Sequence, residues 1–527
     1  MFNRTMLRAA AALASISLVA GCGLFSDNDA EGAKPVVVGT TSAPSTLDPA
    51  AAWDGSWELY RNVFQTLLSF PTGSTSPQPD AAENCKFTDA TNTAYQCKLR
   101  ENLTFSNGHK LDAAAVKHTV DRILKINVNG GPSGLLGSLS GVETQGDRTV
   151  TFRLTKADAT FPFILATPAM SLVDPAEYPL DKLREDGKLT GSGPYTLESY
   201  TEGSEALLKK NASYNGFADR KNEAVTIRYF KDSEAMVSAL KGKDIDVTNR
   251  GLTAEEVTAL QEKKSENEGL QVVETVGSDI RYLVFNPKDP AAAKLPVRRA
   301  IAQVVDREAL VSQVYSGTAE PLYSMIPKGI ASHTTSFFDT FGDPDVDKAR
   351  EILQDAGIDE PVELTFWFTT DRYGSATARE FAELKRQLDA SKLFKITLQG
   401  KPWKDFQEGY KNGKYPVFGR GWFPDFPDPD NFIAPFVGKN NALSTPYESA
   451  EIAEQLTLSR RETDRGAGAV SKQFERAQEV LVEDVRLLPL WQGKLHIAAS
   501  EEIAGCERAM DPQTIMQVWE LHRKASW

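Results

Sequence analysis

The sequence predicts an α/β protein built from two α/β regions. Strand-like and helix-like segments alternate through both halves of the chain, which is typical of α/β architecture. A near-continuous apolar run at 282–286 resembles a buried central strand and lies close to the boundary between the halves. The length of 527 residues exceeds what one hydrophobic core fills, so we expect two or three domains.

In the first half, short apolar runs predict strands, and apolar residues spaced three and four apart predict helices. The expected strands are 36–39, 149–154, 225–230 and 245–247, and the expected helices are 57–68, 112–124 and 232–240. Asp112 is expected to cap its helix. Gly191–Tyr195 (GSGPY) is expected to be a rigid turn that opens a strand pair.

The second α/β region begins near Pro287. It shows the same alternation between apolar runs and amphipathic segments. The expected helices are 297–305, 346–356, 376–388, 473–485 and one starting at 406–410, and the expected strands are 362–368 and 394–398.

The composition excludes several classes of protein. With 41% hydrophobic and 25% charged residues, the chain reads as a soluble globular protein. Asp and Glu (72) outnumber Lys and Arg (59), and the net charge of -13 disfavours a nucleic-acid partner. Four cysteines and five histidines leave little room for a zinc or iron–sulfur site, so we expect no metal and no cofactor.

The N-terminus is typical of a secretory signal peptide. Arg4 and Arg8 precede an apolar run at 9–20 that is too short to span a bilayer. The run ends in VAGC, which resembles the bacterial lipobox, in which the cysteine (here Cys22) receives a lipid; an ordinary export signal is the alternative. Removing the first 21 of 527 residues leaves 506, and the loss of two arginines changes the net charge from -13 to -15. Residues 22–34 are expected to form a flexible tether.

Two cysteines are candidates for a disulfide. Cys85 and Cys97 flank a turn-rich segment, and Phe87 and Tyr95 suit strands, so a hairpin would bring the thiols together. Two separate buried thiols are the alternative. Cys506 is expected to be unpaired and buried, without the neighbours of a catalytic thiol.

The usual signatures of catalysis are missing. The chain contains no G-x-S-x-G, no P-loop, no H-E-x-x-H and no dinucleotide fingerprint. Together with the export signal and the two-region pattern, this favours a binding protein and disfavours an enzyme.

The segment 420–432 (RGWFPDFPDPDNF) is the most informative part of the chain. Three carboxylates lie among four aromatic residues and three prolines, which hold the loop stiff. Asp425, close to Trp422 and Phe423, can receive an ammonium group by charge-assisted hydrogen bonding and cation–π attraction. A Pro-rich turn whose acids cap neighbouring elements, or a glycosidase carboxylate pair, would explain the same residues.

At this point the chain resembles a known family, the extracytoplasmic solute-binding proteins of ABC importers, in the dipeptide- and oligopeptide-binding class (solute-binding protein family 5). Five blocks carry the resemblance in the same order. They are STLDP at 45–49, LTFSNGHKL with AAVK at 103–117, GSGPY at 191–195, VRRAI with VDR at 297–307, and GW, D and DP at 421–429.

The resemblance implies a two-lobed clamshell that closes over its ligand, with an extra subdomain inserted in the first lobe. Two strands then cross between the lobes, and we expect them near Tyr282–Asn286 and Leu487–His496. The expected divisions are a signal peptide at 1–21, a tether at 22–34, lobe I at 35–284 with the insertion at about 75–185, lobe II at 285–492, and a return to lobe I at 493–527.

The resemblance also implies a binding site. Asp425 would hold the amino group of a peptide beside a wall formed by Trp422, and Arg372 would hold the peptide carboxylate. The remaining expected ligand-binding residues are Ser45, Ser192, Tyr195 and Asn286.

The implied function is a lipid-anchored, extracytoplasmic and monomeric receptor. It would capture di- or oligopeptides and deliver them to a membrane permease with its ATPase. The alternatives are a non-peptide solute in the same fold, such as a nickel chelate, an opine or a sugar, and a secreted lipoprotein hydrolase.

Overall fold

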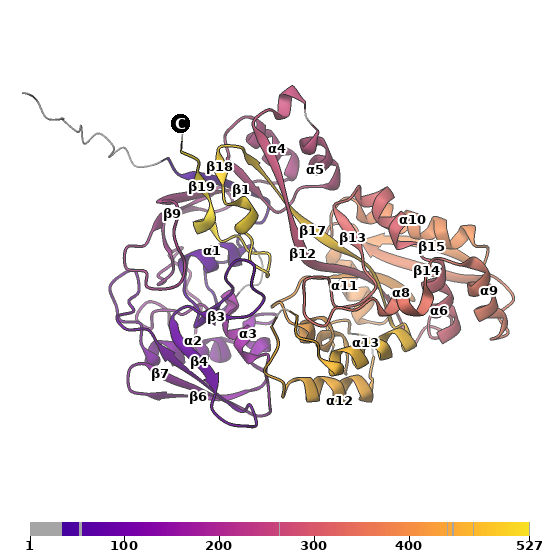
Figure 1. Cartoon of the computed structure of the whole chain (residues 1–527), viewed down its shortest axis with the longest axis horizontal. Coiled ribbons are helices and arrows are strands. Elements are labelled where there is room, and N and C mark those ends of the chain that lie inside the picture. The colour runs from indigo at the N-terminus through magenta and orange to yellow at the C-terminus, as the bar shows by residue number, and fades with distance from the viewer. Residues whose placement is uncertain are drawn as a thin grey trace, which may run out of the picture. The chain divides into compact units, whose positions relative to one another are not determined.

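A mixed sheet of eleven strands runs through the part of the chain that the computed structural model describes (Figure 1). The described residues are 34–51, 55–262, 264–439, 441–444, 447–466 and 468–525. The expected signal peptide, Cys22 and the tether up to residue 33 lie outside them. The described residues from 35 onwards form one unit.

The strand order in this sheet is β15-β14-β16-β12-β17-β11-β1-β10-β9-β8, and β13 also pairs with β17. Parallel pairs occur in both halves of the sheet, β1 with β10 and β11, and β14 with β15 and β16. The strands are β1 (Val36–Thr40), β8 (Tyr195–Thr201), β9 (Glu205–Lys210), β10 (Ala224–Tyr229), β11 (Val247–Asn249), β12 (Leu270–Phe285), β13 (Ala319–Pro321), β14 (Val362–Thr369), β15 (Phe394–Lys401), β16 (Val417–Trp422) and β17 (Leu487–Ser500). The expected α/β class is confirmed.

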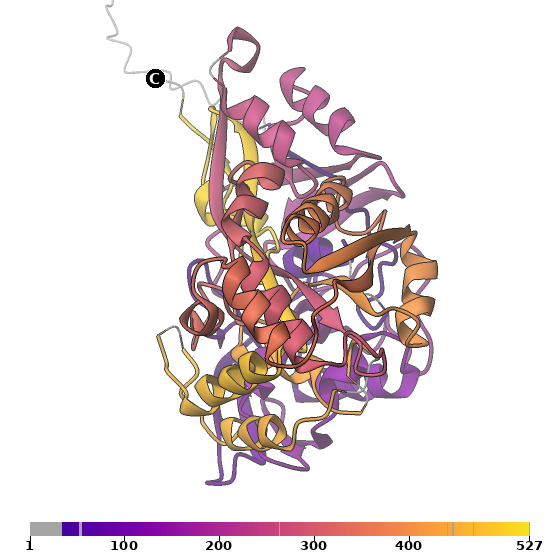
Figure 2. The ribbon, with the colours of Figure 1, turned by 90° about the vertical axis from the view of Figure 1, so that its right-hand side faces the viewer.

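Two long strands connect the lobes. β12 and β17 run side by side and antiparallel, from the pair Leu270 and Ser500 to the pair Val284 and Leu487 (Figures 1 and 2). Near one end, Ile497 belongs to the core of lobe I, whereas at the other end Leu283 belongs to a core of lobe II. Each strand therefore passes from one hydrophobic core to the other.

Lobe I contains an inserted subdomain built on a four-stranded antiparallel sheet of order β4-β5-β7-β6. Cys85 and Cys97 lie opposite each other on β4 and β5 and form a disulfide, while Cys506 is free and buried. These strands are β4 (Ala82–Phe87), β5 (Ala94–Leu99), β6 (Leu139–Gln145) and β7 (Thr149–Leu154), and short pairs join β2 (Leu68–Ser69) to β3 (Gln78–Pro79) and β18 (Ile503–Ala504) to β19 (His522–Arg523).

The helices follow the apolar periodicity of the sequence. Lobe I has α1 (Ser56–Val63), α2 (Ala113–Ile126), α3 (Phe161–Leu165), α4 (Ser233–Lys241) and α5 (Ala254–Gln261). Lobe II has α6 (Leu295–Val304), α7 (Arg307–Leu310), α8 (Ser336–Phe341), α9 (Val346–Gln354), α10 (Thr377–Ala390), α11 (Trp403–Lys411), α12 (Ala450–Ser459) and α13 (Lys472–Asp484). Asp112 caps α2 as expected, because its side chain accepts from the backbone N–H of Ala114 and Ala115.

Three elements differ from the expectations. Helix α1 ends at Val63 and not at residue 68, because the Val63 carbonyl accepts from the Gly193 N–H at 2.8 Å and the GSGPY turn packs on the helix end. A Cβ at Gly193 would lie 2.5 Å from the Val63 backbone, so glycine is required there. Strand β11 begins at Val247, where it aligns with Val38 of β1. Strand β12 begins at Leu270, in a stretch of mixed apolar and polar residues (LQVVETVGSD) that lacks the continuous apolar run of its other end.

The STLDP block has a structural role in lobe I. The Asp48 carboxylate accepts from both terminal nitrogens of Arg122 on α2, at 2.7 and 2.5 Å. Both side chains are at most 1% exposed. A buried charge needs such a partner, so this ion pair ties the loop after β1 to the inserted subdomain.

Candidate functional site

The candidate site begins where the parallel strands of lobe II end together. Strand β14 pairs in parallel with both β15 and β16, so the chain leaves all three strands at one edge of the sheet. Loops at this edge form the ligand sites of many open α/β sheets. Arg372 follows β14, Trp403 follows β15, and Trp422 is the last residue of β16. The segment with Asp425 starts directly after Trp422.

Asn431 holds Asp425 and Trp422 together. The Asp425 N–H donates to Asn431 Oδ1 at 2.9 Å, and Asn431 Nδ2 donates to Asp425 Oδ2 at 3.1 Å. Trp422 Nε1 donates to the same Asn431 Oδ1 at 3.2 Å. The sequence analysis missed Asn431, although it lies within the 420–432 segment; only its contacts reveal its role.

The Asp425 carboxylate has no cationic partner among the described residues. Burial raises the pKa of its carboxyl to about 6, and the hydrogen bond from Asn431 acts in the opposite direction. No cationic group in the described part of the chain contributes to this pKa. The Trp422 ring, half-buried beside it, lies edge-on to Phe436 with the centroids 5.1 Å apart. The arrangement suits a small cation such as an ammonium group.

The other two acids of the segment have partners. Arg465 donates to both oxygens of Asp428, at 2.7 and 2.5 Å, and Arg460 donates to both oxygens of Asp430 at 2.9 Å. Asp428 also caps the 3-10 turn Pro429–Phe432 by accepting from the Asp430 N–H. The alternative of a turn stabilised by its own acids therefore holds for Asp428 and Asp430. It does not hold for Asp425.

The segment reaches from lobe II into lobe I. Phe426 is 4% exposed, and its ring belongs to the core of lobe I, 6.1 Å from the ring of Phe163. In addition, Gln513, from the C-terminal return to lobe I, donates to the Asp425 carbonyl at 2.5 Å. Asp425 therefore lies at a contact between the two lobes.

Three further predicted residues have polar groups that are exposed or unpaired. Arg372 is exposed, its guanidinium lies 5.5 Å from the Trp403 ring, and it makes no ion pair within the described ranges. Ser45 is exposed on the loop after β1. Ser192 is 1% exposed, and its hydroxyl has no hydrogen-bond partner among the described residues.

Two further predicted ligand-binding residues are buried and already hydrogen-bonded within the protein. Tyr195 is fully buried in the core of lobe I, and its hydroxyl donates to Asn222 at 2.9 Å. Asn286 is 2% exposed, and its amide donates to the carbonyls of Gly413 and Tyr415 at 2.9 and 3.1 Å. Because these groups are enclosed and already paired, we leave both residues out of the site.

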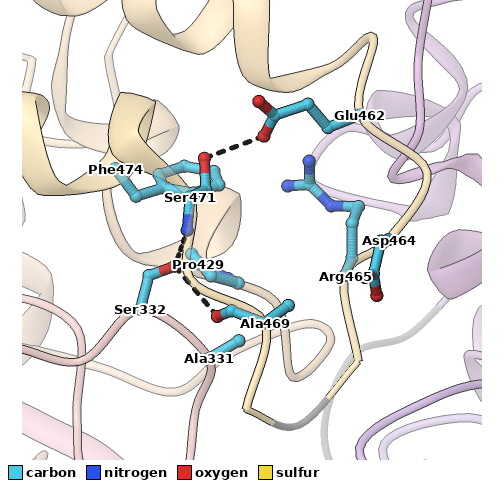
Figure 3. A pocket seen from close by; sticks show the side chains of 9 residues that line it. All are labelled: Ala331, Ser332, Pro429, Glu462, Asp464, Arg465, Ala469, Ser471 and Phe474. Atoms are coloured by element: carbon cyan, nitrogen blue, oxygen red, sulfur yellow. Dashed lines mark hydrogen bonds between the residues drawn. The ribbon is translucent and has the colours of Figure 1, made fainter.

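A small pocket is lined in part by Pro429 of the segment (Figure 3). Its volume of about 10 Å³ suits one water molecule. Pro429 and Arg465 line it, and Ser471 donates to Glu462 at its rim at 2.8 Å. A second pocket of about 300 Å³ is lined by lobe II residues between 308 and 338 and shares none with the Asp425 segment.

The described part of the chain holds no group of His, Cys, Asp and Glu side chains arranged for a metal ion. Within the same ranges, none of the helices combines the length and apolar character needed to cross a bilayer.

The fold has two lobes, and Asp425, which has no cationic partner among the described residues, lies at a contact between them. The chain belongs to the bacterial extracellular solute-binding proteins, family 5, whose middle region matches residues 76–444. Members of this family bind solutes for transport and are not enzymes, so the hydrolase alternative is dropped.

Relatives support this assignment. A probable D,D-dipeptide-binding periplasmic protein of Escherichia coli is 26% identical over 491 residues, which cover 89% of this chain and 90% of that protein. A dipeptide-binding protein of Pseudomonas aeruginosa is 26% identical over 504 residues, which cover 90% of this chain and 92% of that protein. The solved dipeptide-binding protein of Pseudoalteromonas in complex with Met-Leu superimposes with a TM-score of 0.74 at 18% identity, covering 93% of this chain and 100% of its own. Other relatives are named heme-binding and glutathione-binding proteins.

Proposed function

We propose that this protein captures peptides with a free amino terminus outside the cytoplasmic membrane and delivers them to an ABC permease. One observation carries the proposal. Asp425 is a half-buried acid with no cationic partner among the described residues, lies beside Trp422 and sits at a contact between the lobes. The names of the dipeptide-binding relatives support the same ligand class.

Each end of the peptide has a candidate partner. The ammonium group would bind Asp425 by charge-assisted hydrogen bonds, with Trp422 as the aromatic wall. Arg372, exposed at the same sheet edge, would bind the carboxylate. Ser45 and Ser192 would contribute hydroxyl groups from lobe I. A ligand that touches both lobes binds the closed form more tightly, and so shifts the population towards it.

Calorimetry on the mature protein tests the site. We expect di- to tetrapeptides to bind and their N-acetylated counterparts to bind at least 100-fold more weakly. Asp425→Ala should no longer bind peptides with a free amino terminus, whereas the exposed control Asp347→Ala should bind them with unchanged affinity. Unchanged affinity in folded Asp425→Ala would overturn the assignment.

The same panel separates the rival solutes. Glutathione, heme, an opine, a sugar and a nickel chelate are added as competitors, and mass spectrometry identifies any ligand that co-purifies. A competitor that binds more tightly than every peptide, and keeps its affinity in Asp425→Ala, would favour a non-peptide ligand.

The membrane anchor is tested separately. We propose that Cys22 carries the lipid, so Cys22→Ser should move the protein from the membrane fraction to the soluble fraction without changing its peptide affinity. Chromatography with light scattering should give a monomer. Peptide uptake by cells should require both the protein and its permease.

A further inference from the structure

We propose that Gln513 is a positioning residue for Asp425 and couples the ligand acid to lobe I. The inference rests on the proposed function, in which Asp425 binds the amino group of the ligand. Gln513 lies in the C-terminal return to lobe I, 88 residues after Asp425 in the sequence.

The Gln513 side chain bridges two groups that belong to different lobes. Its Nε2 donates to the main-chain carbonyl of Asp425, and its Oε1 accepts from Arg61 on α1 at 2.6 Å. The residue is 4% exposed. The bridge is therefore enclosed in protein, where a lost hydrogen bond leaves buried polar groups unpaired.

The chemistry of the two neighbours explains why an amide occupies this position. The Arg61 guanidinium only donates and the Asp425 carbonyl only accepts, so the side chain between them must accept on one side and donate on the other. A glutamine amide does both. An ionised carboxylate would keep the bond to Arg61 but could not donate to the carbonyl.

Lobe I holds Gln513 firmly in place. The Arg61 guanidinium also donates to Ser69 Oγ and to the Ala166 carbonyl, both at 2.9 Å, and lies 3.3 Å from the carboxylate of Asp511. Asp511 in turn accepts from the backbone N–H of Gln513 at 2.9 Å. Both the side chain and the backbone of Gln513 are thus fixed to the same buried network.

Asp425 is therefore fixed from both lobes. Asn431 of lobe II accepts from its N–H, and Gln513 of lobe I donates to its carbonyl. The two hydrogen bonds fix the backbone of Asp425 on either side of its side chain and so orient the carboxylate. Separation of the lobes breaks the Gln513 bond, so the acid is fully positioned only while the lobes are in contact.

The first experiment compares Gln513→Met and Gln513→Glu with the control Gln517→Met. Gln517 is a buried glutamine of the same segment whose amide donates to the Phe70 carbonyl at 2.6 Å and does not touch Asp425. The probe is the tightest-binding free-amine dipeptide of the panel, measured by calorimetry. We expect both Gln513 variants to bind about 5- to 30-fold more weakly, and the control to bind within about twofold of wild type.

A double-mutant cycle separates positioning from general damage. In an Asp425→Asn background, Gln513→Met should cause no further loss of affinity, because its effect passes through Asp425. An equal loss in both backgrounds would overturn the proposal. Thermal unfolding of each variant checks that Gln513→Met and Gln517→Met remain folded.

A ligand-free measurement tests the coupling directly. Spin labels on cysteines that replace the exposed residues Gln145 and Lys472 report the distance between the inserted subdomain and lobe II. Gln513→Met should shift the distribution towards longer distances, whereas Gln517→Met should not. An unchanged distribution would overturn the proposal. Failure of wild type to bind any peptide would instead overturn the proposed function, and the distances would still show whether Gln513 joins the lobes.

Discussion

The side-chain amide of Asn431 binds Asp425 twice, accepting from its N–H at 2.9 Å and donating to its carboxylate at 3.1 Å. This pairing fixes the acid at the end of β16 without neutralising it. An arginine or lysine in place of Asn431 would form an ion pair with the Asp425 carboxylate, which would then be unavailable to a cationic ligand. The site therefore depends on a neutral neighbour as much as on the acid.

Asn431→Ala should weaken peptide binding about tenfold, equivalent to about 1.4 kcal/mol, because Asp425 and the Trp422 indole both lose their partner. Calorimetry with the dipeptide probe measures the change. Asn267→Ala removes a buried amide that donates to the Ala259 carbonyl in lobe I, and should leave affinity unchanged. Equal losses in the two variants would contradict the prediction.

Peptide affinity should fall as the pH drops through about 6, because the pKa of Asp425 is raised to about 6 and the protonated acid no longer attracts an ammonium group. Between pH 7 and 8 affinity should level off. Asp425→Asn should bind weakly and lose this dependence. A wild-type affinity that is constant from pH 5 to 8 would contradict the assignment.

The same raised pKa has the opposite effect on the ligand-free fold. A carboxyl with a folded pKa above its ordinary value contributes stability at low pH that is lost as pH rises through about 6. Asp425→Asn should therefore increase the unfolding free energy more at pH 7.5 than at pH 5. Denaturant unfolding of wild type and variant at the two pH values measures this change in unfolding free energy. A larger increase at pH 5 than at pH 7.5 would contradict the prediction.

Asp428→Asn should destabilise the protein by about 3–5 kcal/mol, because it leaves the buried Arg465 without its counter-charge. The matched control is Glu363→Gln, which breaks an exposed pair with Lys395 and should change stability little. Urea unfolding of both variants provides the test. Similar midpoints for the two would show that the Asp428 pair is not structural.

Replacing Cys85 and Cys97 with serine should lower the unfolding free energy by about 3 kcal/mol, the value for a closed loop of this size. Peptide affinity should change little, because β4 and β5 do not contribute to the Asp425 segment. Reducing agent should lower the melting temperature of wild type but not of the double variant. If reducing agent lowered the melting temperature of the double variant as well, the loss of stability would not come from the Cys85–Cys97 disulfide.

Local patterns predicted most of the secondary structure. The apolar periodicity of α2, α10 and α13 and the apolar runs of β14 and β15 located these elements within a few residues. The errors occurred where distant parts of the chain act on local structure. Gly193 ends α1 at Val63, and pairing with β17 extends β12 back through 270–279, a mixed stretch without the continuous apolar run that predicted the strand.

The sequence by itself determined the α/β class, the family resemblance and the segment that carries the proposed site. It could not distinguish the three acids of that segment, since each is an aspartate in the same Pro-rich loop. Only the tertiary structure decided between them, because Arg465 and Arg460 come from more than twenty residues away to neutralise Asp428 and Asp430. Asp425 meets amides instead, from Asn431 and from Gln513, and its charge remains available to a ligand.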